Sequence, residues 1–150
     1  MNIHFICRGN VLRSLIAETY LRSLQLADVT VSSSGTNVNL TDPTEQGYFA
    51  NTIALFKHHD IEKYAKDTSH QLTQERADGQ DVTICMNQRV VNEAKSLVAL
   101  PKNTINWDIV DIGEGHRTIS EDIRLYEEEI FREIVVRVDK LVKQLKLDKS

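Results

Sequence analysis

Four short segments, three apolar runs and the alternating run Val29–Ser34, are separated along the chain by segments of helical pattern. They span Asn2–Ile6, Val29–Ser34, Asp81–Met86 and Thr104–Val110. Apolar runs of this length, bounded by turn residues, are typical of buried strands. Strands that alternate with helices predict a parallel sheet, because each crossover between parallel strands needs room for a helix. We therefore expect an α/β fold in which a parallel sheet is flanked by helices on both faces.

The segments between the strands carry clear helix signals. Apolar residues recur every three or four positions from Ser14, and Asp42-Pro43-Thr44-Glu45 combines a cap, an early proline and a first-turn acid. Thr118-Ile119-Ser120-Glu121 has the pattern of a capping box that opens a long helix. The apolar stripe of that helix is Ile123, Tyr126, Ile130, Ile134, Val138, Leu141 and Leu145. The polar runs Asn37–Asp42 and Asp60–Ser69 are interpreted as surface loops, so residues 1–150 are expected to form one domain.

Composition excludes several classes of function. The 150 residues are 41% hydrophobic and 27% charged, which is ordinary for one globular domain. The net charge of −4 and the scattered basic residues disfavour a nucleic-acid partner. The sequence has no apolar run that could span a membrane, and its first residues lack the features of a signal peptide. Two cysteines, Cys7 and Cys85, are too few for a disulfide framework, so we expect a reduced, cytoplasmic protein.

The segment between the first strand and the first helix carries the candidate chemistry. It begins at Cys7, contains Gly9-Asn10, a pair suited to unusual backbone angles, and leads into the helix at Ser14. Ligands of open parallel sheets bind beyond the carboxyl ends of the strands. That edge is expected to carry Cys7, Gly35, Asn87 and Asp111.

A phosphate dianion is best held by backbone N–H groups, a helix N-terminus and a bidentate guanidinium. The loop offers all three, and its expected phosphate-binding residues are Arg8, Gly9, Asn10, Val11, Leu12, Arg13 and Ser14. The positive electrostatic field of these groups also favours the thiolate form of Cys7, which is the nucleophilic form. The Ser14 hydroxyl can add a hydrogen bond to this thiolate. The spacing from Cys7 to Arg13 alone also fits a core cysteine beside a surface arginine. The surrounding strand, Gly-Asn pair and helix favour an anion site instead.

The loop and four other blocks resemble a known family. The loop reads Phe5-Ile6-Cys7-Arg8-Gly9-Asn10-Val11-Leu12-Arg13-Ser14-Leu15-Ile16-Ala17-Glu18, which is similar to the signature of the low-molecular-weight protein tyrosine phosphatases. The other blocks are Ser33-Ser34-Gly35-Thr36, His70-Gln71-Leu72-Thr73, Ile84-Cys85-Met86-Asn87 and Trp107-Asp108-Ile109-Val110-Asp111. The resemblance implies a four-stranded parallel sheet, hydrolysis of protein phosphotyrosine through a cysteinyl-phosphate, and no metal or other cofactor.

Several positions depart from the family pattern. Leu15 replaces the usual proline, and Leu12 replaces a second cysteine that many members use to protect the nucleophile. His70 and Asn87 stand where arginine and aspartate are common. The general-acid loop of the family normally continues with proline, but here it reads Asp111-Ile112-Gly113.

The resemblance makes Asp111 the catalytic acid, in addition to Cys7 and Arg13. A carboxyl at the mouth of the loop protonates the leaving group and later activates water. Position alone favours the other interpretation, an acid that caps or solubilises a turn, because that is the commoner role of an acid beside glycines. Asp108 is the rival, although we expect it inside the fourth strand and it matches no catalytic position of the family.

Other residues with possible chemistry are given structural interpretations. His58, His59 and His116 lack partners at metal-ligand spacing, so we expect no metal site. Cys85 lies inside an apolar run and is interpreted as a buried thiol. The run Glu127–Glu129 is interpreted as a solvated helix face.

These residues are compatible with three different functions. A phosphatase would bind phosphorylated proteins or small phosphomonoesters, and anions such as phosphate and vanadate. An arsenate reductase has the same fold and loop, but it normally uses two further cysteines and this chain offers only Cys85. A weakly active or non-enzymatic anion-binding relative would explain the altered acid loop.

Among substrates, Val11 argues against phosphoarginine, because the family member that hydrolyses it has threonine there. The lack of aromatic residues in Asn37–Leu40 and Ile112-Gly113 leaves phosphotyrosine unestablished.

Overall fold

The computed structural model describes residues 1–109 and 123–147. Its strands are β1 (Asn2–Cys7), β2 (Thr30–Gly35), β3 (Val82–Cys85) and β4 (Thr104–Asn106). They form one parallel sheet in the order β2-β1-β3-β4. The helices are α1 (Arg13–Ser23), α2 (Pro43–His58), α3 (Gln74–Ala77), α4 (Gln88–Leu97) and α5 (Ile123–Gln144), with a 3-10 turn η1 at Glu62–Tyr64. The four-stranded parallel sheet that the sequence predicts is confirmed.

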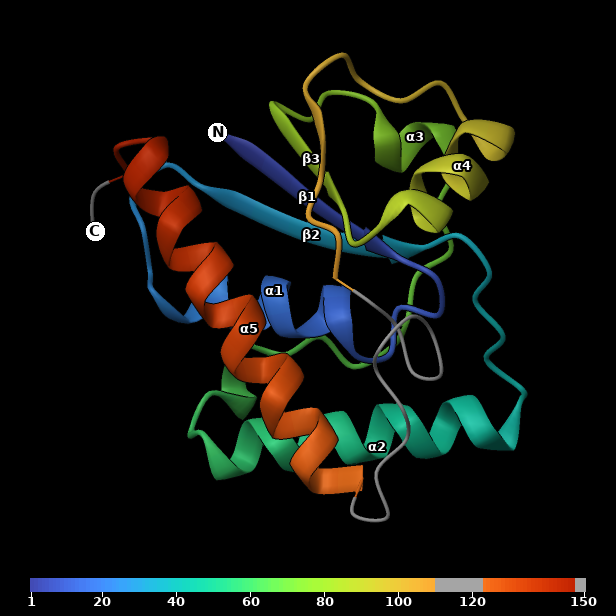
Figure 1. Cartoon of the computed structure of the whole chain (residues 1–150), viewed down its shortest axis with the longest axis vertical. Helices are drawn as coiled ribbons and strands as arrows, with labels where there is room; N and C mark the ends of the chain where they lie inside the picture. The colour runs from blue at the N-terminus through green and yellow to red at the C-terminus, as the bar shows by residue number, and fades with distance from the viewer. Residues whose placement is uncertain (110–122, 148–150) are drawn as a thin grey trace.

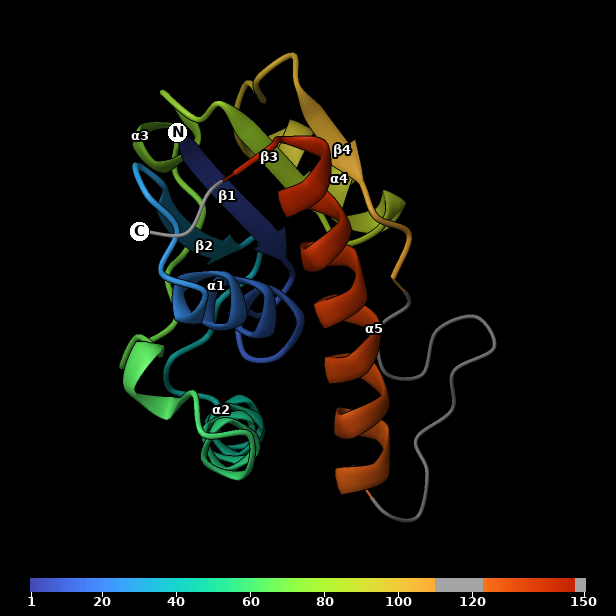
Figure 2. The same ribbon diagram turned by 90° about the vertical axis from the view of Figure 1, so that its left-hand side faces the viewer.

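Helices cover both faces of the sheet. Figures 1 and 2 show α1 and α5 against one face, with α2 packed beyond them, while α3 and α4 lie on the opposite face. None of the described helices is both long and apolar enough to cross a membrane.

Two hydrophobic cores follow from the alternation of side chains along the central strands. Ile3 and Phe5 of β1 point to the α1–α5 face, where they pack with buried residues such as Ile134. Ile6 of β1 and Cys85 of β3 point to the other face and pack against α3 and α4. Because β1 and β3 bury both faces, their apolar runs are nearly continuous, which is the pattern expected of central parallel strands.

The helix starts differ in how their backbone N–H groups are satisfied. At α2, the Asp42 side chain accepts a hydrogen bond from the N–H of Thr44 at 2.9 Å, as the sequence predicts. The α1 helix follows Leu12 and has no side-chain cap. Its first N–H groups are therefore directed toward the loop after β1 without a capping side chain.

The fourth strand is shorter than the sequence predicts. It ends at Asn106 rather than at Val110, which lies outside the described residues. Asp108 adopts the left-handed conformation, with φ of 57°, and its N–H donates to the Asn106 side chain instead of to a neighbouring strand. Asp108 is exposed and lies beyond the strand, so the prediction that it sits inside the strand is wrong.

The long terminal helix agrees with its predicted stripe over the described part. Tyr126, Ile130, Ile134 and Val138 are buried against the sheet and α1. The predicted capping box at Thr118-Ile119-Ser120-Glu121 lies outside the described residues.

Candidate active site

Cys7 ends β1 at the carboxyl edge of the sheet and is buried. Two groups contact its sulfur. The backbone N–H of Asn10 donates to Cys7 Sγ at 3.2 Å, and the Ser14 hydroxyl lies 2.9 Å from the same atom. Burial disfavours negative charge on the sulfur. Hydrogen-bond donors placed in this way oppose that effect and stabilise the thiolate.

Asn10 holds the loop in its turn. Its φ of 54° places it in the left-handed region, which asparagine tolerates better than most residues. Its side-chain amide donates to Ser14 Oγ at 2.6 Å and to Ser33 Oγ at 2.9 Å. Its Oδ1 accepts the backbone N–H of His70 at 2.9 Å, and this contact decides which way the amide faces.

A buried ionic network supports this asparagine from behind. Ser33 donates to Glu18 Oε1 at 2.7 Å, and Glu18 is also paired with Arg22 at 2.7 Å. Lys66 donates to the Ser33 carbonyl at 2.9 Å and lies 3.7 Å from Glu18. Burial lowers the pKa of Lys66 to about 8, although the negative charges of Glu18 and Cys7 oppose this change.

Glycine is required at position 35 by the close approach of the loop. A Cβ atom there would lie 2.5 Å from the Arg8 carbonyl oxygen and 2.9 Å from the Asn10 nitrogen, both backbone atoms. The β2 end also binds the loop directly, since Thr36 N–H donates to the Cys7 carbonyl and Asn37 N–H to the Arg8 carbonyl. The end of β2 therefore supports the curved loop.

The two arginines of the loop point in different directions. Arg13 is buried, and its Nη1 donates to the Ile109 carbonyl at 3.0 Å, which the Asn87 side chain also contacts at 3.2 Å. Arg8 turns to α4, where its Nε lies 3.3 Å from Glu93 Oε2. Arg13 thus lies within the site, whereas the Arg8 guanidinium is bound at its margin.

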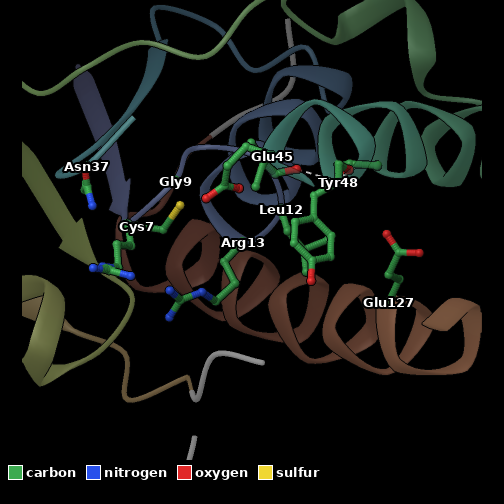
Figure 3. A pocket seen from close by; sticks show the side chains of 11 residues that line it. Cys7, Gly9, Leu12, Arg13, Asn37, Glu45, Tyr48 and Glu127 are labelled. Carbon is green, nitrogen blue, oxygen red and sulfur yellow. Dashed lines mark hydrogen bonds between the residues drawn. The ribbon is translucent and has the colours of Figure 1, made fainter. Parts of the chain in front are cut away.

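A cavity of about 210 Å³ opens over the loop. Figure 3 shows the Cys7 sulfur at one end of it, beside the Glu45 carboxylate, with Tyr48 further along and Glu127 at the far end. The lining residues are Cys7, Arg8, Gly9, Val11, Leu12, Arg13, Asn37, Glu45, Tyr48, Thr52 and Glu127. Apart from Asn10 and Ser14, all predicted phosphate-binding residues line this cavity.

Several of these neighbours were missed by sequence reasoning. The predicted solvated face at Glu127–Glu129 is wrong for Glu127, which is only 4% exposed and lines the cavity. The segment Asp60–Ser69 is more than a surface loop, since Ser69 is buried and donates to the Asn10 carbonyl at 2.7 Å. Tyr48 supplies an aromatic wall from α2, where no motif pointed to one.

The predicted catalytic acid, Asp111, lies outside the described residues. His59 has local partners, since its ring stacks on Phe131 and its Nε2 bonds to Glu128. Within residues 1–109 and 123–147, no three histidine, cysteine or acidic side chains lie close enough together to hold a metal ion.

The family model for low molecular weight phosphotyrosine protein phosphatases matches residues 2–150. The chain belongs to this family. The four-stranded parallel sheet flanked by helices, with Cys7 at the end of β1, is thus the fold of a phosphatase family. A comparison with curated proteins found no significant match.

Solved structures of this phosphatase fold resemble the chain over nearly its whole length. Wzb of Vibrio vulnificus, in complex with benzylphosphonate, is 19% identical, with 95% of this chain and 97% of that chain covered and a TM-score of 0.71. The YwlE arginine phosphatase of Geobacillus stearothermophilus is 26% identical, with coverages of 97% and 92% and a TM-score of 0.69. A thioredoxin-dependent arsenate reductase of Corynebacterium glutamicum is 21% identical, with coverages of 97% and 61% and a TM-score of 0.65.

Proposed function

We propose that the protein hydrolyses phosphate monoesters through a cysteinyl-phosphate on Cys7, and that its substrate is phosphotyrosine in proteins. The observation that carries the proposal is the placement of one sulfur. Cys7 Sγ receives the Asn10 N–H and contacts the Ser14 hydroxyl, at the end of a cavity that Arg13 also lines. A nucleophile, its stabilising donors and a guanidinium therefore meet in a space open to a substrate.

In the first step, the phosphate group lies in the loop against backbone N–H groups, the α1 N-terminus and Arg13. The Cys7 thiolate attacks phosphorus and forms the S–P bond. The P–O bond to the leaving group breaks, and its electron pair stays on the leaving oxygen. Asp111 donates a proton to that oxygen, so that an alcohol or phenol departs.

In the second step, water attacks the phosphorus of the cysteinyl-phosphate. The Asp111 carboxylate accepts the proton of this water, and the S–P bond breaks. Inorganic phosphate leaves, Cys7 returns to the thiolate and Asp111 is again protonated. In both transition states negative charge is spread over the three equatorial oxygens of the phosphoryl group, so fixed donors in the loop that contact these oxygens accelerate both steps.

The side walls of the cavity support an aryl substrate. Tyr48 and Leu12 lie along it between Cys7 and Glu127 (Figure 3), which gives a phenyl ring an apolar surface next to the phosphate loop. Val11 also lines the cavity and has no side-chain hydroxyl to contact a guanidinium. An arsenate reductase function is disfavoured, because Cys85 is buried on β3 and the sequence holds no third cysteine.

The decisive experiment compares two cysteine variants. We expect Cys7→Ser to abolish turnover of p-nitrophenyl phosphate near pH 6 while orthovanadate still binds, because the backbone cradle and Arg13 remain. Cys85→Ser is the matched control and should keep the parent activity. Turnover by Cys7→Ser would contradict the proposed mechanism. A parent protein that binds vanadate but is inactive would favour the non-enzymatic alternative.

A substrate panel tests the finer proposal. Phosphotyrosine peptides, phosphoserine peptides, phosphoarginine and sugar phosphates are compared by kcat/KM. We expect phosphotyrosine peptides to be hydrolysed fastest, and a clear preference for any other member of the panel would replace phosphotyrosine as the proposed substrate.

A further inference from the structure

Glu127 is an unusual residue for the wall of a phosphate site. It lies on α5 and is only 4% exposed, yet it makes no hydrogen bond or salt bridge with any residue in 1–109 or 123–147. Its neighbour Glu128, in contrast, is bound by His59, whose Nε2 lies 2.8 Å from Glu128 Oε2. Burial together with the nearby charge of Glu128 raises the pKa of Glu127.

The Glu127 side chain faces the substrate cavity. It lines this space together with Cys7 and Tyr48, and Figure 3 shows its carboxylate on the far side of Tyr48 from the Cys7 sulfur. A second carboxylate, that of Glu45, lies closer to the loop, with Oε2 only 3.3 Å from where a Cβ on Gly9 would be. The cavity therefore has an anion-binding loop at one end and acidic side chains along the wall that leads away from it.

We propose that Glu127, assisted by Glu45, binds a positive charge of the substrate, namely the lysine or arginine side chain next to the phosphorylated tyrosine. This inference rests on the proposed function. A peptide with both groups places its phosphate in the loop and its cation at the acidic end, so the carboxylate of Glu127 acquires a partner that residues 1–109 and 123–147 do not supply.

The acidic end fits a cationic side chain better than a metal ion. Glu127 and Glu45 come from different helices, α5 and α2, and the described residues do not supply a third carboxylate, histidine or cysteine to complete a metal site. A lysine or arginine side chain needs fewer ligands, because water and backbone carbonyls satisfy its remaining N–H groups. A carboxylate beside the phosphate loop also repels acidic peptides, which adds discrimination against them.

Three phosphotyrosine peptides that differ at one residue test the inference. The residue beside phosphotyrosine is lysine, norleucine or glutamate, so that the norleucine peptide keeps the length of lysine without its charge. We expect kcat/KM to favour lysine over norleucine by roughly tenfold, and norleucine over glutamate by a smaller factor. In Glu127→Gln, which keeps the shape of the side chain and removes its charge, the lysine preference should fall to about threefold or less.

The controls separate this inference from general effects of charge. Glu75→Gln removes the same charge from the exposed, distant helix α3 and should leave the lysine preference at the parent value. Glu127→Lys should invert the order of the lysine and glutamate peptides. An equal lysine preference in the parent and Glu127→Gln would overturn the inference.

Two further outcomes identify other failures. If the parent turns over none of the phosphotyrosine peptides or p-nitrophenyl phosphate, the proposed function fails first. If a phosphoarginine peptide is hydrolysed in a Glu127-dependent manner while lysine beside phosphotyrosine has no effect, the charge lies on the leaving group itself and our assignment to a neighbouring residue is wrong.

Discussion

The side-chain nitrogen of Asn10 lies 2.6 Å from Ser14 Oγ, and this contact decides the direction of the next hydrogen bond. Because Asn10 is the donor, Ser14 accepts from it and keeps its own hydroxyl proton for Cys7 Sγ, 2.9 Å away. Asn10 is oriented in turn by the N–H of His70. A contact from a distant segment thus aims the hydroxyl that stabilises the nucleophile.

Removal of this hydroxyl should slow the chemistry of Cys7. A hydrogen bond to a charged group contributes about 1.5–3 kcal/mol, so we expect Ser14→Ala to lose roughly 10- to 100-fold in kcat/KM and in the rate of Cys7 alkylation by iodoacetate at neutral pH. Ser96→Ala, at an exposed position of α4, is the control. Unchanged alkylation in Ser14→Ala would show that the hydroxyl does not act on the sulfur.

The two loop arginines should respond differently to the same change. Arg13→Lys should reduce kcat/KM by roughly 10²–10³-fold, since an ammonium cannot replace the paired N–H groups of a guanidinium that contacts the phosphoryl oxygens. Arg8→Lys should reduce it by less than about tenfold, because the Arg8 guanidinium is paired with Glu93 on α4. Equal losses in steady-state assays would mean that the loop is oriented differently.

The role of Asp111 is tested by leaving groups of different quality. Asp111→Asn should lose about 10²–10⁴-fold on phosphotyrosine, whose phenoxide needs a proton to depart, and less on p-nitrophenyl phosphate. Asp108→Asn is the matched control, and its exposed side chain leads us to expect parent-like kinetics on both substrates. A leaving-group dependence that follows Asp108 would reassign the acid to that residue.

Peroxide should inactivate the enzyme irreversibly. Leu12 occupies the place of the protective cysteine of many relatives, and Cys85 is fully buried on β3. Burial raises the pKa of Cys85 to about 12, so this thiol cannot supply a thiolate to capture oxidised Cys7. We expect less than about a tenth of the activity to return with dithiothreitol after prolonged peroxide, and mass spectrometry should find sulfinic or sulfonic acid at Cys7. Full recovery would contradict this.

Acid should destabilise the fold through His4. This buried ring bonds to Ser32 and Ser34, and burial, with the charges of Lys66 and Arg76, lowers its pKa from 6.5 to about 4. The unfolded chain therefore binds a proton more readily between these two pH values, so stability falls as the pH drops through this window. The loss from His4 amounts to about 3 kcal/mol, at about 1.4 kcal/mol per pH unit.

Urea unfolding at a series of pH values measures this loss. His4→Gln should flatten the decline between pH 6.5 and 4, whatever its stability at pH 7. His58→Gln removes an exposed histidine and should keep the parent slope. A parent-like slope in His4→Gln would assign the acid sensitivity to another group.

Much of the fold could be predicted from the sequence because its signals are local. The apolar runs of β1 and β3 predict central strands, and Asp42 followed by Pro43 predicts the start of α2. The strand, the Gly-Asn turn and the helix around Cys7 also lie within a few residues of one another. Backbone geometry in such a stretch depends on neighbours in the chain, so its residues alone point to an anion-binding loop.

The sequence by itself thus determined the parallel sheet, the loop and the pair Cys7 and Arg13. The tertiary structure alone decided what surrounds them: Ser69 and Lys66 behind the loop, Tyr48 along the cavity and Glu127 at its far end. These residues belong to segments far from Cys7 in the chain, and their own neighbourhoods read as a polar loop or an exposed helix face. Burial and cavity contacts depend on how helices pack across space, and local sequence does not encode that packing in any short pattern.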